Sequence, residues 1–382
     1  MILCLSPKKV PKWILATYHH VRHNHNGLIK ALTESNGIIL QSLSTDIYLN
    51  LAAENWLHET LLFDKKQPPA LFLWRNSATV VIGRHQNPWQ ECNLQLMRDN
   101  SIRLARRKSG GGAVYHDLGN INLTFFTSKQ SHNRLANLTL ITRALKAVRP
   151  HLNITVSERH DLLLNGSWKI SGTAAKLGRM ASYHHCTLLC NADRGLLSAV
   201  LKSPFGCDIQ SNATASVSAS VKNLCEVDDT LTPELLMGAI AAEFARQHRL
   251  HPRIQLIDPA DESALPGVGS KAAELRSWEW VYGRTPVFSI NCCFDVGSEK
   301  TPNEIQLNVT VKGGRIESCS ITSSKDWLPF ETCQYLSANL VGSKFCPIET
   351  KLLVSALMRI YPQDFELRSR CSTLCEKMIE VM

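Results

Sequence analysis

The sequence predicts an α+β fold, with a large mixed-sheet domain and a smaller C-terminal α+β domain. Strand and helix patterns interleave along the 382 residues without the steady strand–helix alternation of a doubly wound parallel sheet. Apolar runs on either side of Asn165-Gly166 predict a β-hairpin, because this dipeptide favours the two-residue turn that joins antiparallel strands. A sheet that contains hairpins as well as strands separated by helices is expected to be mixed.

The individual elements follow from hydrophobic periodicity and from residues that start and stop helices. Asp46, or Thr45 before it, is placed to cap a helix, and Pro68-Pro69 lies beyond the end of that helix. Pro150 terminates a second, amphipathic helix. The expected strands cover 38–43, 70–74, 79–83, 102–105, 161–164, 168–172 and 184–189, and the expected helices cover 46–62, 88–100, 138–148 and 233–248.

A change of composition divides the chain near residue 265. Asp, Pro and Gly residues gather between 258 and 270, a pattern typical of a linker. Strands at 287–290, 304–311 and 315–321, followed by two helices, are expected beyond it. We therefore expect a large domain at 37–257, a linker at 258–270 and an accessory domain at 271–382.

The N-terminal segment 1–31 has the character of a targeting signal. Five basic residues stand against Glu34 alone in the first 36 residues, and no apolar region of a secretory signal follows them. This composition resembles a mitochondrial transit peptide and predicts location in the mitochondrial matrix, with a disordered basic tail as the alternative. No apolar run approaches the ~18 residues that span a bilayer, so no membrane partner is expected.

The run Arg106-Arg107-Lys108-Ser109-Gly110-Gly111-Gly112 combines three consecutive cations with three consecutive glycines. Glycine has no Cβ and tolerates positive φ, so a glycine run allows backbone N–H groups to close on a ligand. Inward N–H groups form an anion-binding nest, and neighbouring Arg and Lys side chains add full charges. The residues alone allow either a phosphate clamp or a glycine-rich hairpin turn on a basic surface.

Five segments of this chain, in order, resemble the lipoate-protein ligases and lipoyltransferases. The segments are 83–89, 106–122, 159–174, 184–189 and 278–286, which include Lys169-Ile170-Ser171-Gly172 and His184-His185-Cys186-Thr187-Leu188-Leu189. The resemblance spans roughly residues 37 to 382, and the mitochondrial lipoyltransferases of animals are the branch that fits best. It implies that 37–257 is a catalytic domain with the fold of the biotin and lipoate protein ligases, which is similar to class II synthetase cores.

The resemblance also implies that the site binds lipoyl-AMP. The phosphate of an acyl adenylate needs N–H donors and cations, and the charge that develops at its oxygens needs a fixed cation. Lys169 is the candidate catalytic cation. The expected ligand-binding residues are Arg106, Ser109, Gly110, Gly111, Gly112, Tyr115, Arg159, Asp161, Lys169, Thr187, Thr214 and Ala215.

Two aspects of the chemistry stay open on the sequence. His116, Asp117 and Asp161 are the possible general bases for the acceptor amine. Cys186 beside two histidines opens a thioester route, in which the acyl group passes through the thiol, although an ordinary strand cysteine is the simpler interpretation. No metal is expected, because Cys186 and Cys190 lack the partner pair of a zinc site.

The implied reaction is transfer of an activated lipoyl group, from lipoyl-AMP or from a lipoylated H-protein-type carrier, to a lysine ε-amine. Segment 218–224 lacks the arginine that bacterial relatives carry there, which favours transfer over a complete ATP-dependent ligase. The implied partners are the E2 lipoyl domains of the pyruvate, 2-oxoglutarate and branched-chain 2-oxoacid dehydrogenases, and the glycine-cleavage H protein. A monomer is expected.

Two other functions compete with this one. A biotin-ligase-like activity shares the adenylate chemistry, but the Arg-Arg-Lys-Ser-Gly-Gly-Gly pattern fits the lipoyl branch better. An RNA-binding protein is the non-enzyme alternative because the chain is basic, with a formal charge of +9. Its cations are dispersed and show no aromatic-interleaved RNA-binding signature, so no nucleic-acid partner is expected.

Overall fold

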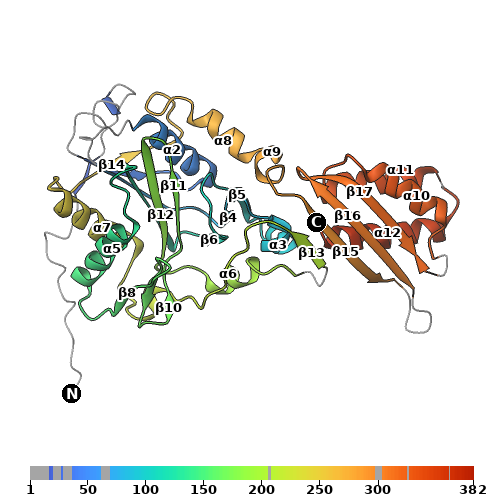
Figure 1. Cartoon of the computed structure of the whole chain (residues 1–382), viewed down its shortest axis with the longest axis horizontal. Coiled ribbons are helices and arrows are strands. Elements are labelled where there is room, and N and C mark those ends of the chain that lie inside the picture. The colour runs from blue at the N-terminus through green and yellow to red at the C-terminus, as the bar shows by residue number, and fades with distance from the viewer. Residues whose placement is uncertain are drawn as a thin grey trace, which may run out of the picture. The chain divides into compact units, whose positions relative to one another are not determined.

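The structure is a computed structural model of the whole chain and describes residues 17–19, 27–28, 37–61, 69–204, 208–296, 303–324, 327–360 and 362–382. The chain forms two compact units, each assembled from three segments (Figure 1). Unit 1 contains residues 1–81, 107–197 and 217–275, and unit 2 contains residues 82–106, 198–216 and 276–382.

Unit 1 is built on a seven-stranded mixed sheet, as the sequence predicts. The strand order is β1 (Thr17–His19), β14 (Arg253–Ile257), β2 (Ile38–Ser42), β3 (Ala70–Trp74), β7 (Asn120–Ser128), β12 (Ala181–Leu189) and β11 (Thr173–Leu177). The first four strands pair in parallel, and β3, β7, β12 and β11 pair antiparallel. The buried strands β3 and β7 occupy the middle, where both faces of the sheet are covered.

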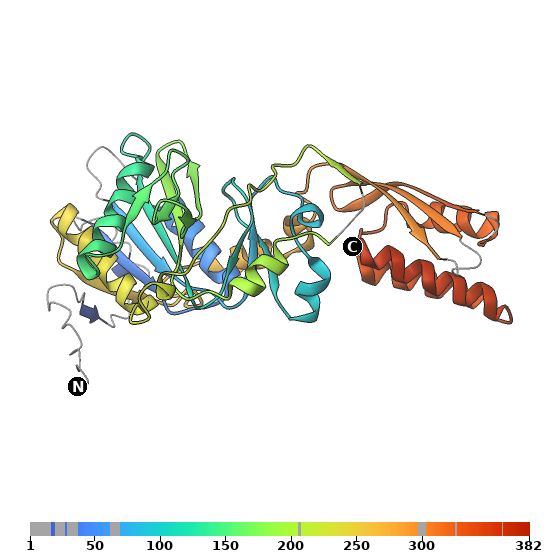
Figure 2. The same cartoon turned by 90° about the horizontal axis from the view of Figure 1, so that it is seen from below.

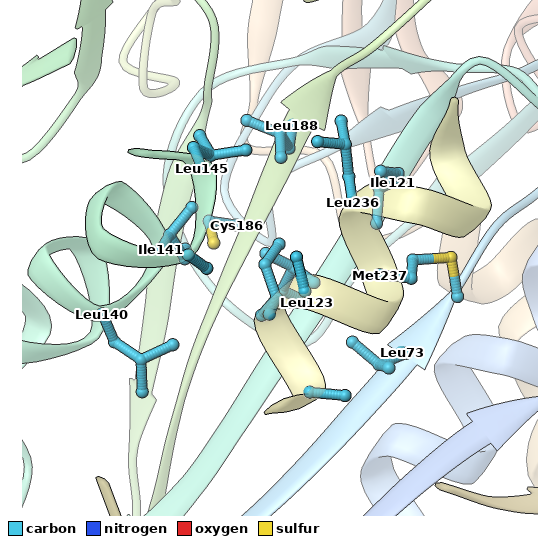
Figure 3. Packing of buried hydrophobic residues seen from close by; sticks show 14 of the residues in the cluster. Leu73, Ile121, Leu123, Leu140, Ile141, Leu145, Cys186, Leu188, Leu236 and Met237 are labelled. Carbon is cyan, nitrogen blue, oxygen red and sulfur yellow. The ribbon is translucent and has the colours of Figure 1, made fainter. Parts of the chain in front are cut away.

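Helices α5 (Arg134–Val148) and α7 (Pro233–His248) cover one face of this sheet. Figure 3 shows their apolar side chains meeting those of β3, β7 and β12 in one buried cluster. Helix α2 (Ile47–Thr60) packs on β12 from the other face and begins at Asp46, whose carboxylate accepts the N–H groups of Tyr48 and Leu49. The predicted cap at Asp46 is therefore confirmed.

A second, three-stranded sheet lies beside the large one in unit 1. It consists of β8 (Ile154–Val156), β9 (Leu162–Leu164) and β10 (Trp168–Lys169). The predicted hairpin around Asn165-Gly166 is confirmed, because both residues have positive φ, 53° and 75°, between the antiparallel β9 and β10. Leu164 pairs with Trp168, so the loop has three residues and not the two that the dipeptide favours. Strand β6 (Val114–His116) pairs with β4 (Thr79–Ile82) and follows the glycine run directly.

Unit 2 contains a four-stranded antiparallel sheet in the order β13 (Asp208–Ser211), β15 (Phe288–Asp295), β16 (Glu304–Lys312) and β17 (Arg315–Ser323). Its C-terminal helices are α10 (Phe330–Leu340), α11 (Pro347–Ile360) and α12 (Phe365–Glu380), and α12 runs beneath the sheet in Figure 2. Two helices were expected here; Asp364, which accepts the N–H of Leu367, starts the third.

The expected helix at 88–100 is two short helices, α3 (Pro88–Glu91) and α4 (Leu94–Asp99). Cys92 is extended, and the Asn93 side chain caps α4 by accepting the N–H of Leu96. The remaining elements are β5 (Arg103–Arg106), α6 (Arg194–Val200), a 3₁₀ turn at Leu224–Glu226, α8 (Val268–Arg276) and α9 (Trp278–Val281).

The expected domain limits at 257 and 270 remain a proposal, and the compact units are more interleaved than a linear division. Within the expected linker, Leu265 and Val268 are buried and the Trp56 indole donates to the carbonyl of Pro266. Most of the expected leader, residues 1–31, lies outside the described residues. In the part of the chain that the structure describes, no helix combines the length and apolarity needed to cross a membrane.

Truncation of a core side chain tests this packing. Leu188 is completely buried in the cluster of Figure 3, so Leu188→Ala should lower the free energy of unfolding by about 2–5 kcal/mol. Leu118→Ala is the matched control, because Leu118 is 52% exposed and its truncation should change stability by less than about 0.5 kcal/mol. Urea unfolding of both variants measures the difference, and equal losses would contradict the assigned core.

Candidate active site

The glycine-rich loop is organised from within by Arg107. The guanidinium group is 4% exposed and donates to the carbonyls of Gly110 (2.6 Å), Gly112 (2.7 Å) and Val81 (3.1 Å). Burial lowers the pKa of Arg107 to about 10, which leaves the group charged at neutral pH. Gly110 and Gly111 are exposed above it, and Gly111 has a φ of 89°. The backbone of Gly110 and Gly111 is therefore open to solvent, whereas the Arg107 guanidinium is buried on the inner side of the loop.

Arg106, the neighbouring residue, belongs to unit 2. Its fully buried guanidinium donates to the carbonyls of Gly83, Arg84, Gln86 and Val281 and to the hydroxyl of Thr285. These acceptors occupy the whole fork of the side chain, since Nε, Nη1 and Nη2 are each engaged. We therefore revise the expected role of Arg106 from a ligand contact to a residue that positions the 83–86 turn.

The glycine-rich loop, β11 and β12 meet in unit 1. A Cβ on Gly111 would lie 3.4 Å from that of Ala174, so β11 packs directly against the loop. The N–H of Gly172 donates to the Thr187 hydroxyl (2.8 Å), and the Thr187 N–H donates back to the Gly172 carbonyl (2.9 Å). Thr187 thus holds the turn between β10 and β11 on β12.

Lys169 and Asp161 form the central ion pair of the candidate site. Their side chains are 25% and 17% exposed, and Nζ lies 2.9 Å from Oδ1. Asp161 is placed by a tight turn, in which His160 has a φ of 63° and Ser157 Oγ accepts the Asp161 N–H. Lys169 lies on β10, bonded through its backbone to Ser220 and Lys222. Four residues, 170–173, separate Lys169 from Ala174, which contacts the glycine-rich loop.

The other expected residues are distributed more widely. Tyr115 is buried in β6, and burial raises its pKa to about 12, so it is a neutral phenol. Arg159 is exposed on the turn before Asp161, and Asp161 pairs with Lys169 instead. Thr214 and Ala215 are exposed residues of unit 2, where the Thr214 N–H donates to the His85 carbonyl.

The three candidate bases differ sharply in their surroundings. His116 is 3% exposed and its Nδ1 lies 2.9 Å from the Asn76 amide; burial, with Arg107 and His185 nearby, lowers its pKa to about 3. Such a weak base is a poor proton acceptor at neutral pH. Asp117 accepts the N–H groups of Gly119 and Asp193, as a turn residue does. Asp161 alone of the three lies beside Lys169.

The thioester route through Cys186 is wrong for this structure. Side chains alternate along β12, so Cys186 and His185 point to opposite faces of the sheet. Figure 3 shows Cys186 among apolar side chains of α5 and α7, including Ile141 and Leu145. It is 3% exposed, and burial raises the pKa of its thiol to about 12, which keeps it protonated and unreactive.

Glu54 is a functional candidate that the sequence expectations missed. It is 1% exposed on α2, and its Oε1 lies 2.9 Å from His185 Nδ1. The available signal was a charged residue directly after the apolar run Leu51-Ala52-Ala53, within a predicted helix. Among the described residues, no group of three His, Cys, Asp or Glu side chains is arranged to hold a metal ion.

The lipoyl protein ligase A/B catalytic domain matches residues 46–245, which include the glycine-rich loop, the ion pair and most of the mixed sheet, and the chain belongs to that family. It is 56% identical over 348 residues to the mitochondrial lipoyl amidotransferase LIPT1 of Mus musculus, covering 91% of this chain and 92% of the relative. It is 37% identical to lipoate-protein ligase A of Psychrobacter cryohalolentis over 85% of this chain and 94% of the relative.

Solved structures agree with this assignment. LipL1 of P. falciparum in complex with lipoate matches with a TM-score of 0.56 and 26% identity, covering 90% of this chain and 99% of that one. A lipoate-protein ligase A bound with ATP matches with a TM-score of 0.52 and 25% identity over 64% of this chain and 97% of that one. The predicted family, fold and mitochondrial location are confirmed.

Cys186 offers a direct check on the discarded thioester route. Cys186→Ala should keep the rate of acyl transfer within about twofold of the wild type, because the thiol faces the core and only packing changes. Intact-protein mass spectrometry during turnover should show no acyl adduct on the wild-type enzyme that is absent from Cys186→Ala. An adduct mapped to Cys186, or a transfer rate that falls by orders of magnitude in a folded variant, would restore that route.

The buried His116 should make stability depend on pH. Because its pKa is about 3 in the folded state and about 6.5 in the unfolded state, the unfolded chain binds more protons between these values. Stability should therefore fall as the pH drops below about 6.5, with about 2 kcal/mol lost to this residue at pH 5. Chemical unfolding at pH 7.5 and pH 5 should show this extra loss in wild type and not in His116→Asn. Exposed His251→Asn is the control and should behave as wild type.

Proposed function

We propose that this chain transfers a lipoyl group to the ε-amine of a lysine on lipoyl domains and forms an amide. The family supports this activity, since two relatives at 55–56% identity are lipoyl amidotransferases by name. The observation that carries the proposal is the Lys169–Asp161 pair on the same strand-and-turn unit that packs against the exposed backbone of the glycine-rich loop. A fixed cation and bare N–H groups are what an acyl adenylate needs.

In the proposed reaction, the acceptor nitrogen attacks the carbonyl carbon of the activated lipoyl group. The C–N bond forms, the bond from carbon to the phosphate oxygen breaks, and AMP leaves with the electron pair. The attacking nitrogen loses one proton in the process. Lys169 stabilises the negative charge that develops on the oxygens, and Asp161 holds the Lys169 ammonium in place through the 2.9 Å pair.

The glycine-rich loop supplies the second half of the site. Ser109, Gly110, Gly111 and Gly112 are proposed to surround the phosphate, with Tyr115, Arg159, Thr187, Thr214 and Ala215 as further ligand-binding residues. The exposure of Gly110 and Gly111 supports this role, because their backbone is open to a ligand. Arg107 keeps that backbone in one conformation from below.

The proposed donor is lipoyl-AMP or a lipoylated H-protein-type carrier. A complete ATP-dependent ligase is the second candidate, favoured by the similarity to a lipoate-protein ligase A bound with ATP. Against it, segment 218–224 carries Ser218-Ala219-Ser220-Val221-Lys222 without an arginine to meet a triphosphate. A mass-spectrometric time course with an apo lipoyl domain distinguishes them: product from lipoyl-AMP alone indicates a transferase, and product from lipoate with ATP indicates a ligase.

The proposed acceptors are the E2 lipoyl domains of the pyruvate, 2-oxoglutarate and branched-chain 2-oxoacid dehydrogenases and the glycine-cleavage H protein, in the mitochondrial matrix. Lipoyl domains are generally acidic, and the formal charge of +9 on this chain favours their encounter by electrostatic steering. Rates should therefore fall as ionic strength rises. The enzyme is proposed to act as a monomer.

Removal of the Lys169 charge tests the mechanism. Lys169→Met should lower the transfer rate by about 10²–10³-fold, the ~3–4 kcal/mol that one oxyanion-stabilising donor contributes, and Lys169→Arg should lie between it and wild type. Transfer from lipoyl-AMP to an apo lipoyl domain, followed by mass spectrometry, measures the effect. Lys146→Met, at an exposed position of α5, is the matched control and should leave the rate unchanged. A folded Lys169→Met variant with the wild-type rate would exclude the assigned role.

A further inference from the structure

A continuous chain of hydrogen bonds joins the glycine-rich loop to helix α2. Arg107 Nε donates to Ser109 Oγ (3.1 Å), Ser109 Oγ lies 2.9 Å from His185 Nε2, and His185 Nδ1 lies 2.9 Å from Glu54 Oε1. None of the four side chains is more than 11% exposed. Three elements distant in sequence, α2, the loop and β12, are therefore tied by side chains at one point.

The chemistry of Glu54 at one end and of Arg107 at the other decides which atom donates and which accepts in each hydrogen bond of this chain. Glu54 Oε1 meets two donors, the Thr124 hydroxyl at 2.7 Å and the His185 ring at 2.9 Å, which favours an ionised carboxylate that only accepts. His185 Nδ1 must therefore carry a hydrogen. At the other end, Ser109 Oγ accepts from Arg107, which leaves its own O–H free to donate to His185 Nε2.

Charge balance favours the same arrangement. Arg107 is a buried cation whose other donors meet neutral carbonyls, and an isolated buried charge is costly. Glu54 is the buried anion at the far end of the chain. With a neutral His185 between them the four groups carry no net charge, whereas a protonated ring would leave one uncompensated positive charge in the interior.

We propose that Glu54 and His185 are positioning residues for the glycine-rich loop. They hold Ser109, and through it the Arg107 guanidinium, in the orientation that aims the carbonyls of Gly110 and Gly112 inward. The backbone above is thereby fixed before the donor binds, so the binding energy of the donor is not spent on ordering the loop. The consequence for donor binding rests on the proposed function. The donor and acceptor roles in the hydrogen-bond chain do not depend on it.

Side-chain ¹⁵N NMR of histidine tests the direction without any substrate. Signals of His185 are identified by their loss in His185→Gln. We expect a neutral ring with hydrogen on Nδ1 and a bare Nε2, and a shift of the Nε2 signal in Ser109→Ala, which removes only one hydroxyl. Signals of His184, on the opposite face of β12 beside Asn137, should stay in place. A ring protonated on Nε2, or a Nε2 signal indifferent to Ser109→Ala, overturns the proposal.

Kinetics test the consequence for the donor. Ser109→Ala, His185→Gln and Glu54→Gln should each raise KM for lipoyl-AMP about tenfold and leave KM for the acceptor domain unchanged. A tenfold change corresponds to ~1.4 kcal/mol, within the range of a hydrogen bond to a charged group. Because Ser109 and His185 act through one chain, the double variant should lose no more than either single variant.

Matched controls separate positioning from general damage. His184→Gln alters the neighbouring, fully buried histidine of β12, which bonds Asn137 and not the loop, so it should lower thermal stability without the selective rise in donor KM. Independent, multiplying effects of Ser109→Ala and His185→Gln would contradict the proposal. If wild-type enzyme transfers nothing from lipoyl-AMP, the proposed function fails. The NMR result then still decides whether the hydrogen bonds from Ser109 through His185 to Glu54 exist. Ser109→Ala carries the test if Glu54→Gln does not fold.

Discussion

The buried guanidinium of Arg107 is the interaction on which the candidate site depends. It gathers the carbonyls of Gly110, Gly112 and Val81 and so turns the glycine run into a defined loop. Without this cation, all three carbonyls would lose their partner, and the buried carbonyl of Val81 would be left unsatisfied at a cost of about 1–3 kcal/mol. Glycine permits the conformation, and the arginine selects it. The open backbone of the loop is thus the outer side of a buried polar structure.

The two faces of strand β12 have different roles, since one carries residues of the candidate site and the other packs into the hydrophobic core. His185 and Thr187 face α2 and the loop, whereas His184, Cys186 and Leu188 face α5 and α7. Because successive side chains of a strand point to opposite faces of the sheet, adjacent residues have different surroundings. Adjacent histidines therefore have different partners, a carboxylate for one and an amide for the other.

Short sequence motifs predicted turns and helix caps well. They did not predict contacts between residues that are distant in sequence. The Asn165-Gly166 hairpin and the Asp46 cap were predictable because each depends on a few consecutive residues. The break at Cys92 was not, since an Asn cap inside a helical pattern is a weak signal. Glu54 and His185 are 131 residues apart, and only the sheet brings them together. The thioester route through Cys186 stayed open for the same reason, because the sequence does not say which face of β12 is the core; the simpler interpretation as an ordinary strand cysteine agrees with its burial.

One boundary between the segments of the two compact units falls at the peptide bond between Arg106 and Arg107. Arg107 is bonded inside unit 1, and Arg106 is bonded inside unit 2 to the Val281 carbonyl and the Thr285 hydroxyl. A shortened chain that ends at residue 275 would keep Arg106 but take away both of these acceptors. Such a truncation would leave a buried guanidinium with fewer partners, so we expect it to lower stability unless Arg106 is replaced as well.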